Sequence, residues 1–214
     1  PAANTGNVAV RLRLRSYDGH DQLGDLDGDA VVLAPGEERE LGWTLPDLDG
    51  QPIGEIGIAI AAEGRRADGR VLLDYLRWDG PPDVRLHRPA GDGDFWRMSW
   101  VNGVSFFSKR FPPSFRISQD RGEGLILHGT RQWTDYRLDT EIVIHLGEYG
   151  GVSVRAQGLR RRYDVRLTRQ GEMQIVRVRD DDVEVLASTP FPLEFATKTA
   201  FSVPVTIGGA SCRE

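Results

Sequence analysis

The chain has 214 residues, of which 39% are hydrophobic and 28% charged, and its formal net charge is −5. This composition is typical of a globular protein with one large domain or two small ones. An acidic chain is a poor general binder of nucleic acid. No apolar run approaches the ~20 residues of a membrane span. We therefore expect neither a nucleic-acid nor a membrane partner.

The opening residues, Pro1 to Gly6, have the composition of a linker rather than that of a signal peptide. We expect either that a signal was removed or that the chain is an excised fragment. The single cysteine, Cys212, cannot form an internal disulfide. Together, the single cysteine and the lack of a signal peptide favour a cytoplasmic location.

The first strand is predicted over residues 8–17, where valine and leucine alternate with arginine. Arg11, Arg13 and Arg15 then share one face of this strand. Two interpretations remain open for them. They grip phosphate or carboxylate groups of a ligand, or they pair with acidic residues on a neighbouring strand.

An acidic loop is predicted over residues 18–29. Asp25, Asp27 and Asp29 stand at alternate positions, and calcium takes several oxygen ligands at short range. The loop departs from an EF-hand, because Ala30 and Gly36 occupy the positions that need glycine and glutamate. Calcium at the three aspartates is one interpretation, and a solvated turn in which aspartate caps its own backbone is the other.

Further strands are predicted on both sides of Gly80-Pro81-Pro82, the best candidate for a domain boundary because proline cannot donate to a strand ladder. Their spacing of roughly 8–12 residues, with turn residues between them, is the signature of an all-β sandwich or barrel. The predicted strands are 30–33, 38–44, 53–62, 71–78, 115–119, 124–128, 135–145, 150–157, 162–168, 172–179, 182–189 and 200–207.

Two segments resemble a known region. The segment from Pro52 to Pro89, with Leu-Asp-Tyr-Leu-Arg-Trp-Asp-Gly at its centre, is similar to the non-catalytic region of some bacterial ADP-ribosylglycohydrolase-family proteins. The opener Trp133-Thr-Asp-Tyr136 and the hairpin Gly151–Tyr163 resemble the concanavalin A-like (laminin-G-like) sandwich that follows there. The likeness covers most of residues 50–190.

The resemblance implies two β-sandwiches in tandem: a galactose-binding-like jelly roll over residues 1–80 and a concanavalin A-like sandwich over 81–214. It also implies an attached catalytic domain, because the helical domain of that family and its paired-aspartate metal motifs do not occur in this sequence. The chain stops in what resembles a penultimate strand. We therefore expect the second sandwich to be truncated at its C-terminal end, or closed by a partner.

The candidate ligand surface lies in the second predicted sandwich. Sugars stack apolar ring faces on aromatic side chains and bond their hydroxyls to polar ones, and the segment 133–163 is rich in both kinds. The alternative interpretation places the aromatics in the core and the arginines in structural ion pairs. The candidate ligand-binding residues are Trp133, Tyr149, Arg155, Gln157, Arg161 and Tyr163.

No catalytic residue is assigned. The four histidines are scattered, and no Gly-x-Ser-x-Gly motif occurs. Asp139 and Glu141, two apart on a predicted strand, are compatible with the paired carboxylates of a retaining glycosidase. We therefore predict a non-catalytic accessory region that binds a glycan or an ADP-ribose-like group. A scaffold without a small ligand and a β-sandwich glycoside hydrolase are the alternatives.

Overall fold

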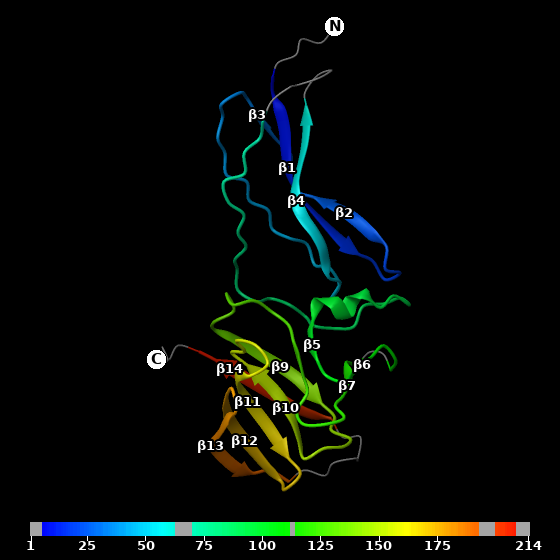
Figure 1. The fold of residues 1–214 in the computed structure, drawn as a ribbon, viewed down its shortest axis with the longest axis vertical. Coiled ribbons are helices and arrows are strands. Elements are labelled where there is room, and N and C mark those ends of the chain that lie inside the picture. Colours follow the sequence, from blue (N-terminus) through cyan, green and yellow to red (C-terminus); the bar gives the residue numbers. More distant parts are fainter. Residues whose placement is uncertain (1–5, 63–69, 112–113, 193–199, 209–214) are drawn as a thin grey trace. The chain divides into compact units, whose positions relative to one another are not determined.

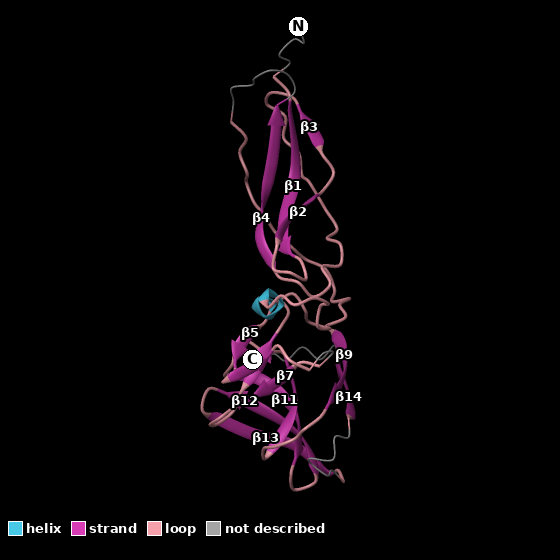
Figure 2. Ribbon diagram, turned by 90° about the vertical axis from the view of Figure 1, so that its right-hand side faces the viewer, coloured by secondary structure: helices cyan, strands magenta, loops and turns pink. Residues whose placement is uncertain are grey.

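The computed structural model describes residues 6–62, 70–111, 114–192 and 200–208. In these ranges the regular structure consists of antiparallel β-strands and one short 3₁₀ helix (Figures 1 and 2). The predicted all-β class is confirmed. The elements are β1 (Val8–Tyr17), β2 (Leu23–Asp27), β3 (Val31–Leu33), β4 (Ile53–Ala62), η1 (Phe95–Ser99), β5 (Val101–Gly103), β6 (Phe106–Ser108), β7 (Arg116–Ser118), β8 (Leu125–Leu127), β9 (Tyr136–Ile142), β10 (Tyr149–Val154), β11 (Arg161–Thr168), β12 (Glu172–Arg179), β13 (Asp182–Pro190) and β14 (Phe201–Ile207).

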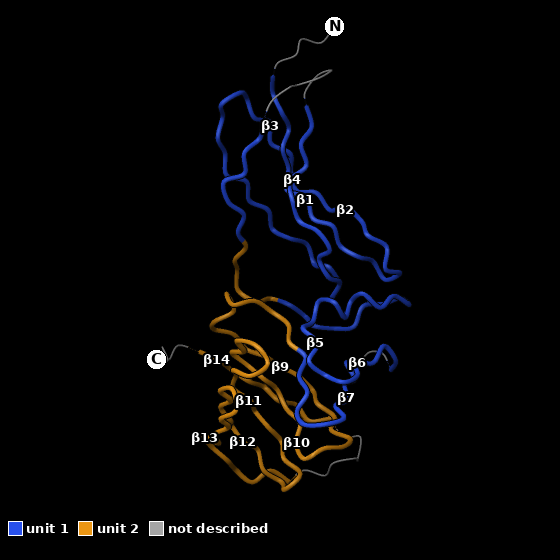
Figure 3. The backbone as a smooth tube through the Cα atoms, viewed as in Figure 1, with its two compact units in different colours: residues 1–77, 84–126 blue, residues 78–83, 127–214 orange. Residues whose placement is uncertain are grey.

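The backbone forms two compact units (Figure 3). The first unit comprises residues 1–77 and 84–126, and the second comprises residues 78–83 and 127–214. The boundary expected after residue 80 falls inside the short segment Trp78–Asp83, which belongs to the second unit. The tandem arrangement of two complete sandwiches stays a prediction.

The first unit is organised around β1, which is the central strand of its largest sheet. β2 and β3 pair with β1 in succession, and β4 pairs with nearly its whole length. Val10 and Leu14 are 2% and 0% exposed, as the alternation of apolar residues along β1 predicts. Each lies opposite an isoleucine of β4.

The prediction of a loop over residues 18–29 is wrong in part, because Leu23–Asp27 forms β2. Arg13 lies opposite Asp27 and Arg15 lies opposite Asp25 in the β1–β2 register. Opposite charges on facing residues stabilise an antiparallel pair, and this cross-strand pairing is why a segment rich in aspartate forms a strand.

The strands predicted over residues 38–44 and 71–78 are also wrong, because neither segment has regular structure. Residues 71–78 alternate, but they place large apolar side chains on both faces, and Leu72 is 88% exposed. Arg77 donates to Glu40 at 3.2 Å, so the two segments are joined by side chains rather than by a ladder. A strand needs a paired neighbour as well as a favourable sequence.

The second unit holds two sheets that share an apolar core. One has four strands in the order β10-β11-β12-β13, and the other pairs β9 with β14. Leu167 of the first sheet, Val203 of the second and Ile144 from the intervening loop form the buried centre. This is the layered packing of a β-sandwich.

Candidate functional site

A tight turn ahead of β9 fixes the position of Trp133. The Trp133 amide donates to the Thr130 carbonyl at 3.2 Å. A Cβ on Gly129 would lie 2.6 Å from the indole ring, and the backbone there has φ +115°, so only glycine fits. The half-buried ring lies near His128 and Tyr136, at centroid distances of 6.0 and 6.4 Å. Trp133 is therefore a packed residue that shapes the turn.

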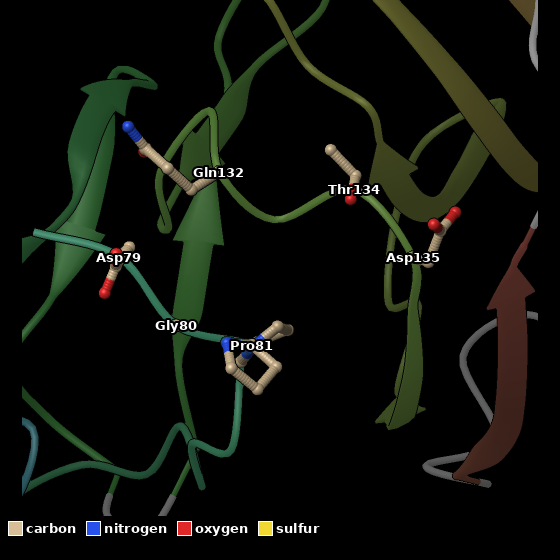
Figure 4. A pocket seen from close by; sticks show the side chains of 7 residues that line it. Asp79, Gly80, Pro81, Gln132, Thr134 and Asp135 are labelled. Carbon is tan, nitrogen blue, oxygen red and sulfur yellow. The ribbon is translucent and has the colours of Figure 1, made fainter.

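Beside this turn lies an open surface hollow of about 480 Å³. Two segments of the second unit line it, namely Asp79–Pro82 and the turn residues Gln132, Thr134 and Asp135 (Figure 4). Two carboxylates, an amide and a hydroxyl supply hydrogen-bonding groups, and two proline rings supply apolar surface. We call this feature the proline hollow.

Arg155 lies next to the proline hollow, directly after the end of β10. Its guanidinium donates to the Asp135 carboxylate at 3.5 Å, and its amide donates to the Tyr136 hydroxyl at 3.5 Å. The backbone of Arg155 has φ +52°, a conformation that costs a non-glycine residue energy. Such strain often occurs at functional sites. Here it places a cation beside a lining carboxylate.

Gln157 and Arg161 belong to the exposed β10–β11 hairpin and have partners within it. The Gln157 amide donates to the Arg161 carbonyl at 2.8 Å. Arg161 forms an ion pair with Asp180 at 2.8 Å. Hydrogen bonding to Arg161 lowers the pKa of Asp180, and the same bond raises the pKa of Arg161. This arrangement matches the structural ion pair that was the alternative interpretation for Arg161.

The two remaining predicted residues, Tyr149 and Tyr163, lie on opposite faces of the four-stranded sheet. Tyr163 lies opposite Val154, on the face that carries the core. The Tyr149 ring lies 4.3 Å from the guanidinium carbon of Arg166, on the other face. The structure therefore brings Trp133 and Arg155 together near the proline hollow, while the other four predicted residues do not form one surface with them.

The sequence analysis missed a buried charge cluster on β11. Asp164 accepts hydrogen bonds from Arg162 at 2.9 Å, from Arg166 at 2.8 Å and from the Ser153 hydroxyl at 2.7 Å. The three charged side chains are 3%, 5% and 10% exposed. The signal was present as Arg-x-Asp-x-Arg with strand periodicity, which places all three on one face.

The arginines of β1 have acidic partners on both neighbouring strands, as one of the two interpretations predicts. Arg13 binds Asp27 at 2.6 Å, and Arg15 binds Asp25 at 2.8 Å and Glu55 of β4 at 3.1 Å. Hydrogen bonding from Arg13 lowers the pKa of Asp27. Calcium at Asp25, Asp27 and Asp29 stays a prediction. A calcium ion there would have to compete with Arg13 and Arg15 for Asp25 and Asp27.

Among the described residues, no group of three or more His, Cys, Asp or Glu side chains lies close enough to hold a metal ion. In the same ranges no helix is long and apolar enough to cross a membrane. Cys212 lies outside the described residues.

The chain matches no protein-family model, no curated protein and no solved structure.

Proposed function

We propose that the chain is a non-catalytic accessory region that binds a carbohydrate in the proline hollow. The observation that carries the proposal is the composition of the lining, in which Asp79, Gln132, Thr134 and Asp135 occur together with Pro81 and Pro82. Carboxylates, amides and hydroxyls bond sugar hydroxyls, and the proline rings offer a surface for the C–H face of a pyranose.

The charges of the lining favour a neutral sugar over an ADP-ribose-like group. Two of the seven lining residues are aspartates, which would repel a diphosphate. Arg155, the cation beside the hollow, already forms an ion pair with Asp135. Neutral hydroxyls, by contrast, gain from charge-assisted hydrogen bonds to the carboxylates.

The hydrogen bonding of Asp139, one of the two carboxylates on β9 that a glycosidase would use, favours binding over hydrolysis. Asp139 accepts hydrogen bonds from Arg137 at 2.8 and 3.0 Å, which lower its pKa. A glycosidase acid needs the opposite, a raised pKa that keeps it protonated. Asp139 therefore serves as an ion-pair partner rather than as a general acid.

The attachment to a hydrolase rests on the resemblance of Pro52–Pro89 and Trp133–Tyr163 to regions that follow a catalytic domain. A carbohydrate-binding region would hold such a domain near glycosylated substrates. The gain would come from effective concentration and would require no new chemistry.

A glycan array followed by calorimetry tests the proposal. We expect the chain to bind a neutral glycan, and Thr134→Val with Gln132→Ala to weaken that binding at least about tenfold, since each change removes a hydrogen bond. Thr206→Val, at an exposed position of β14, is the matched control and should leave affinity unchanged. An array without a ligand, or equal loss in the control, would favour the scaffold alternative.

A further inference from the structure

β4 presents a long strand edge that no other strand covers among the described residues. It has ten residues, and β1 is its one partner strand in the part of the chain that the structure describes. Its register with β1 is regular from Glu55 to Ala62, with an irregularity confined to the Ile53 end. The outer edge therefore offers an uninterrupted row of backbone donors and acceptors from Glu55 to Ala62.

The sequence of β4 lacks the features by which proteins protect such edges. It contains no lysine, arginine or proline, and its one charge, Glu55, is bound by Arg15 at 3.1 Å. β13, the edge of the four-stranded sheet, differs because it carries Asp182, Glu184 and Pro190 and an irregular register at its centre. Charges, prolines and bulges deter edge-to-edge pairing. β13 is thus protected, and β4 is open.

The apolar face of the sheet is also incomplete over β4. Ile60 lies opposite Val10, and Ile56 lies opposite Leu14. The two β1 side chains are almost fully buried, whereas Ile56 and Ile60 are each 51% exposed. Other parts of the chain therefore bury the apolar face of the sheet over β1 but leave it half exposed over β4.

The segment Val71–Trp78 of the same chain could in principle pair with this edge, but its side chains bind another part of the chain. Val71–Trp78 follows β4 and has strand-like alternation. Its Arg77 donates to Glu40 at 3.2 Å, and a hydrogen bond from the Tyr75 hydroxyl to Glu40 raises the pKa of Tyr75. These two bonds fix the segment against the coil that contains Glu40.

A second copy of β4 is the occupant that we infer for this edge, because antiparallel pairing of β4 with itself places apolar residues opposite each other and opposes no like charges. With Ile58 on a twofold axis, antiparallel pairing places Ile56 opposite the partner's Ile60. It also places Glu55 opposite the partner's Ala61, so no like charges meet. Such an edge is self-complementary, as a twofold interface requires. We propose that the chain forms a homodimer through antiparallel β4–β4 pairing centred on Ile58, an inference that goes beyond the proposed carbohydrate binding.

Two double variants test both the dimer and its register. In solution the chain should have twice the 23.8 kDa mass of one copy, measured by light scattering after gel filtration. Ile56→Lys with Ile60→Lys opposes like charges across the twofold axis and should give monomers. Ile56→Lys with Ile60→Glu opposes unlike charges and should restore the dimer. Both variants lose the same apolar surface, so the second controls for the first.

A monomeric parent chain, a dimeric lysine–lysine variant or a monomeric lysine–glutamate variant would each overturn the proposal. Should either variant fail to fold, hydrogen exchange of the unmodified chain decides the question. Protection of the Ile53–Ala62 amides should increase with protein concentration, whereas protection independent of concentration would overturn the proposal.

Discussion

Asp164 holds two arginine side chains inside the second unit. Arg162 and Arg166 both bind its carboxylate, and the Ser153 hydroxyl donates to the same group. Burying three charged groups is costly, and hydrogen bonds must satisfy them. Such a cluster stabilises the fold little compared with apolar side chains of similar size. It becomes strongly destabilising when one partner is lost.

Asp164→Asn should therefore lower the free energy of unfolding by about 3 kcal/mol or more, because two arginines lose their buried counter-charge. Urea unfolding followed by circular dichroism measures this change. The matched control is Asp139→Asn, which breaks an exposed ion pair with Arg137. We expect a much smaller loss there, because solvent screens an exposed ion pair. Equal losses in the two variants would contradict the account.

At the residue scale, the sequence predicted side-chain faces better than side-chain partners. The alternation in β1 placed Val10 and Leu14 inside and the arginines outside. It could not show that Arg155 would adopt a left-handed conformation and bind Asp135, twenty residues earlier. Ion pairs between distant residues depend on register, which periodicity alone leaves open.

Gly151 permits the close approach of two strands. A Cβ at this position would lie 2.0 Å from the Val165 carbonyl oxygen of the neighbouring strand. Gly57 of β4 differs, because a Cβ there would meet nothing within 4 Å. The two glycines occupy strands but have opposite steric environments.

Gly151→Ala should therefore destabilise the chain by about 1–3 kcal/mol, since backbone must move to admit the methyl group. Gly57→Ala should be neutral or stabilise by up to about 1 kcal/mol, because alanine has less backbone freedom to lose. Chemical denaturation of the two variants measures both effects. Similar stabilities would show that the β10–β11 spacing is wider than described.

At the element scale, the sequence predicted strands well where they pair locally. The hairpins β10–β11, β11–β12 and β12–β13 lie close to their expected positions. Prediction failed where pairing depends on other parts of the chain. Asp-rich Leu23–Asp27 became a strand because β1 supplies arginines. Residues 71–78 did not, because none of the described strands pairs with them.

The pH dependence of stability is a property of the whole molecule, and two histidines of the first unit, His20 and His87, contribute to it. A hydrogen bond to Asp92 raises the pKa of His20. The Arg85 carbonyl and then Asp49 raise the pKa of His87. A raised pKa in the fold means that protonation stabilises the fold.

The stabilisation by the two protonated histidines should be complete below the histidine pKa of the unfolded chain, about 6.5. It should be lost as the pH rises through the raised pKa values of the folded chain. The melting temperature should therefore fall as the pH rises above about 6.5. Differential scanning fluorimetry measures it. His20→Gln with His87→Gln should flatten this part of the profile, whereas an unchanged fall would assign the dependence to other groups.

The proline hollow itself could not be predicted from the sequence. Its lining comes from residues 79–82 and from Gln132, Thr134 and Asp135, about fifty positions later in the chain. The sequence marked the first segment as a boundary and the second as a strand opener. The fold brings the two segments together in the second unit, and no local sequence pattern shows that segments so far apart in the chain lie side by side.

The most direct test of the proposed carbohydrate site is an amide chemical-shift map of the ¹⁵N-labelled chain, titrated with a panel of neutral monosaccharides. We predict saturable shift changes at Gly80, Gln132, Thr134, Asp135 and Arg155, the residues that line or adjoin the proline hollow. No shift changes with any sugar, or changes confined to other parts of the chain, would contradict the account.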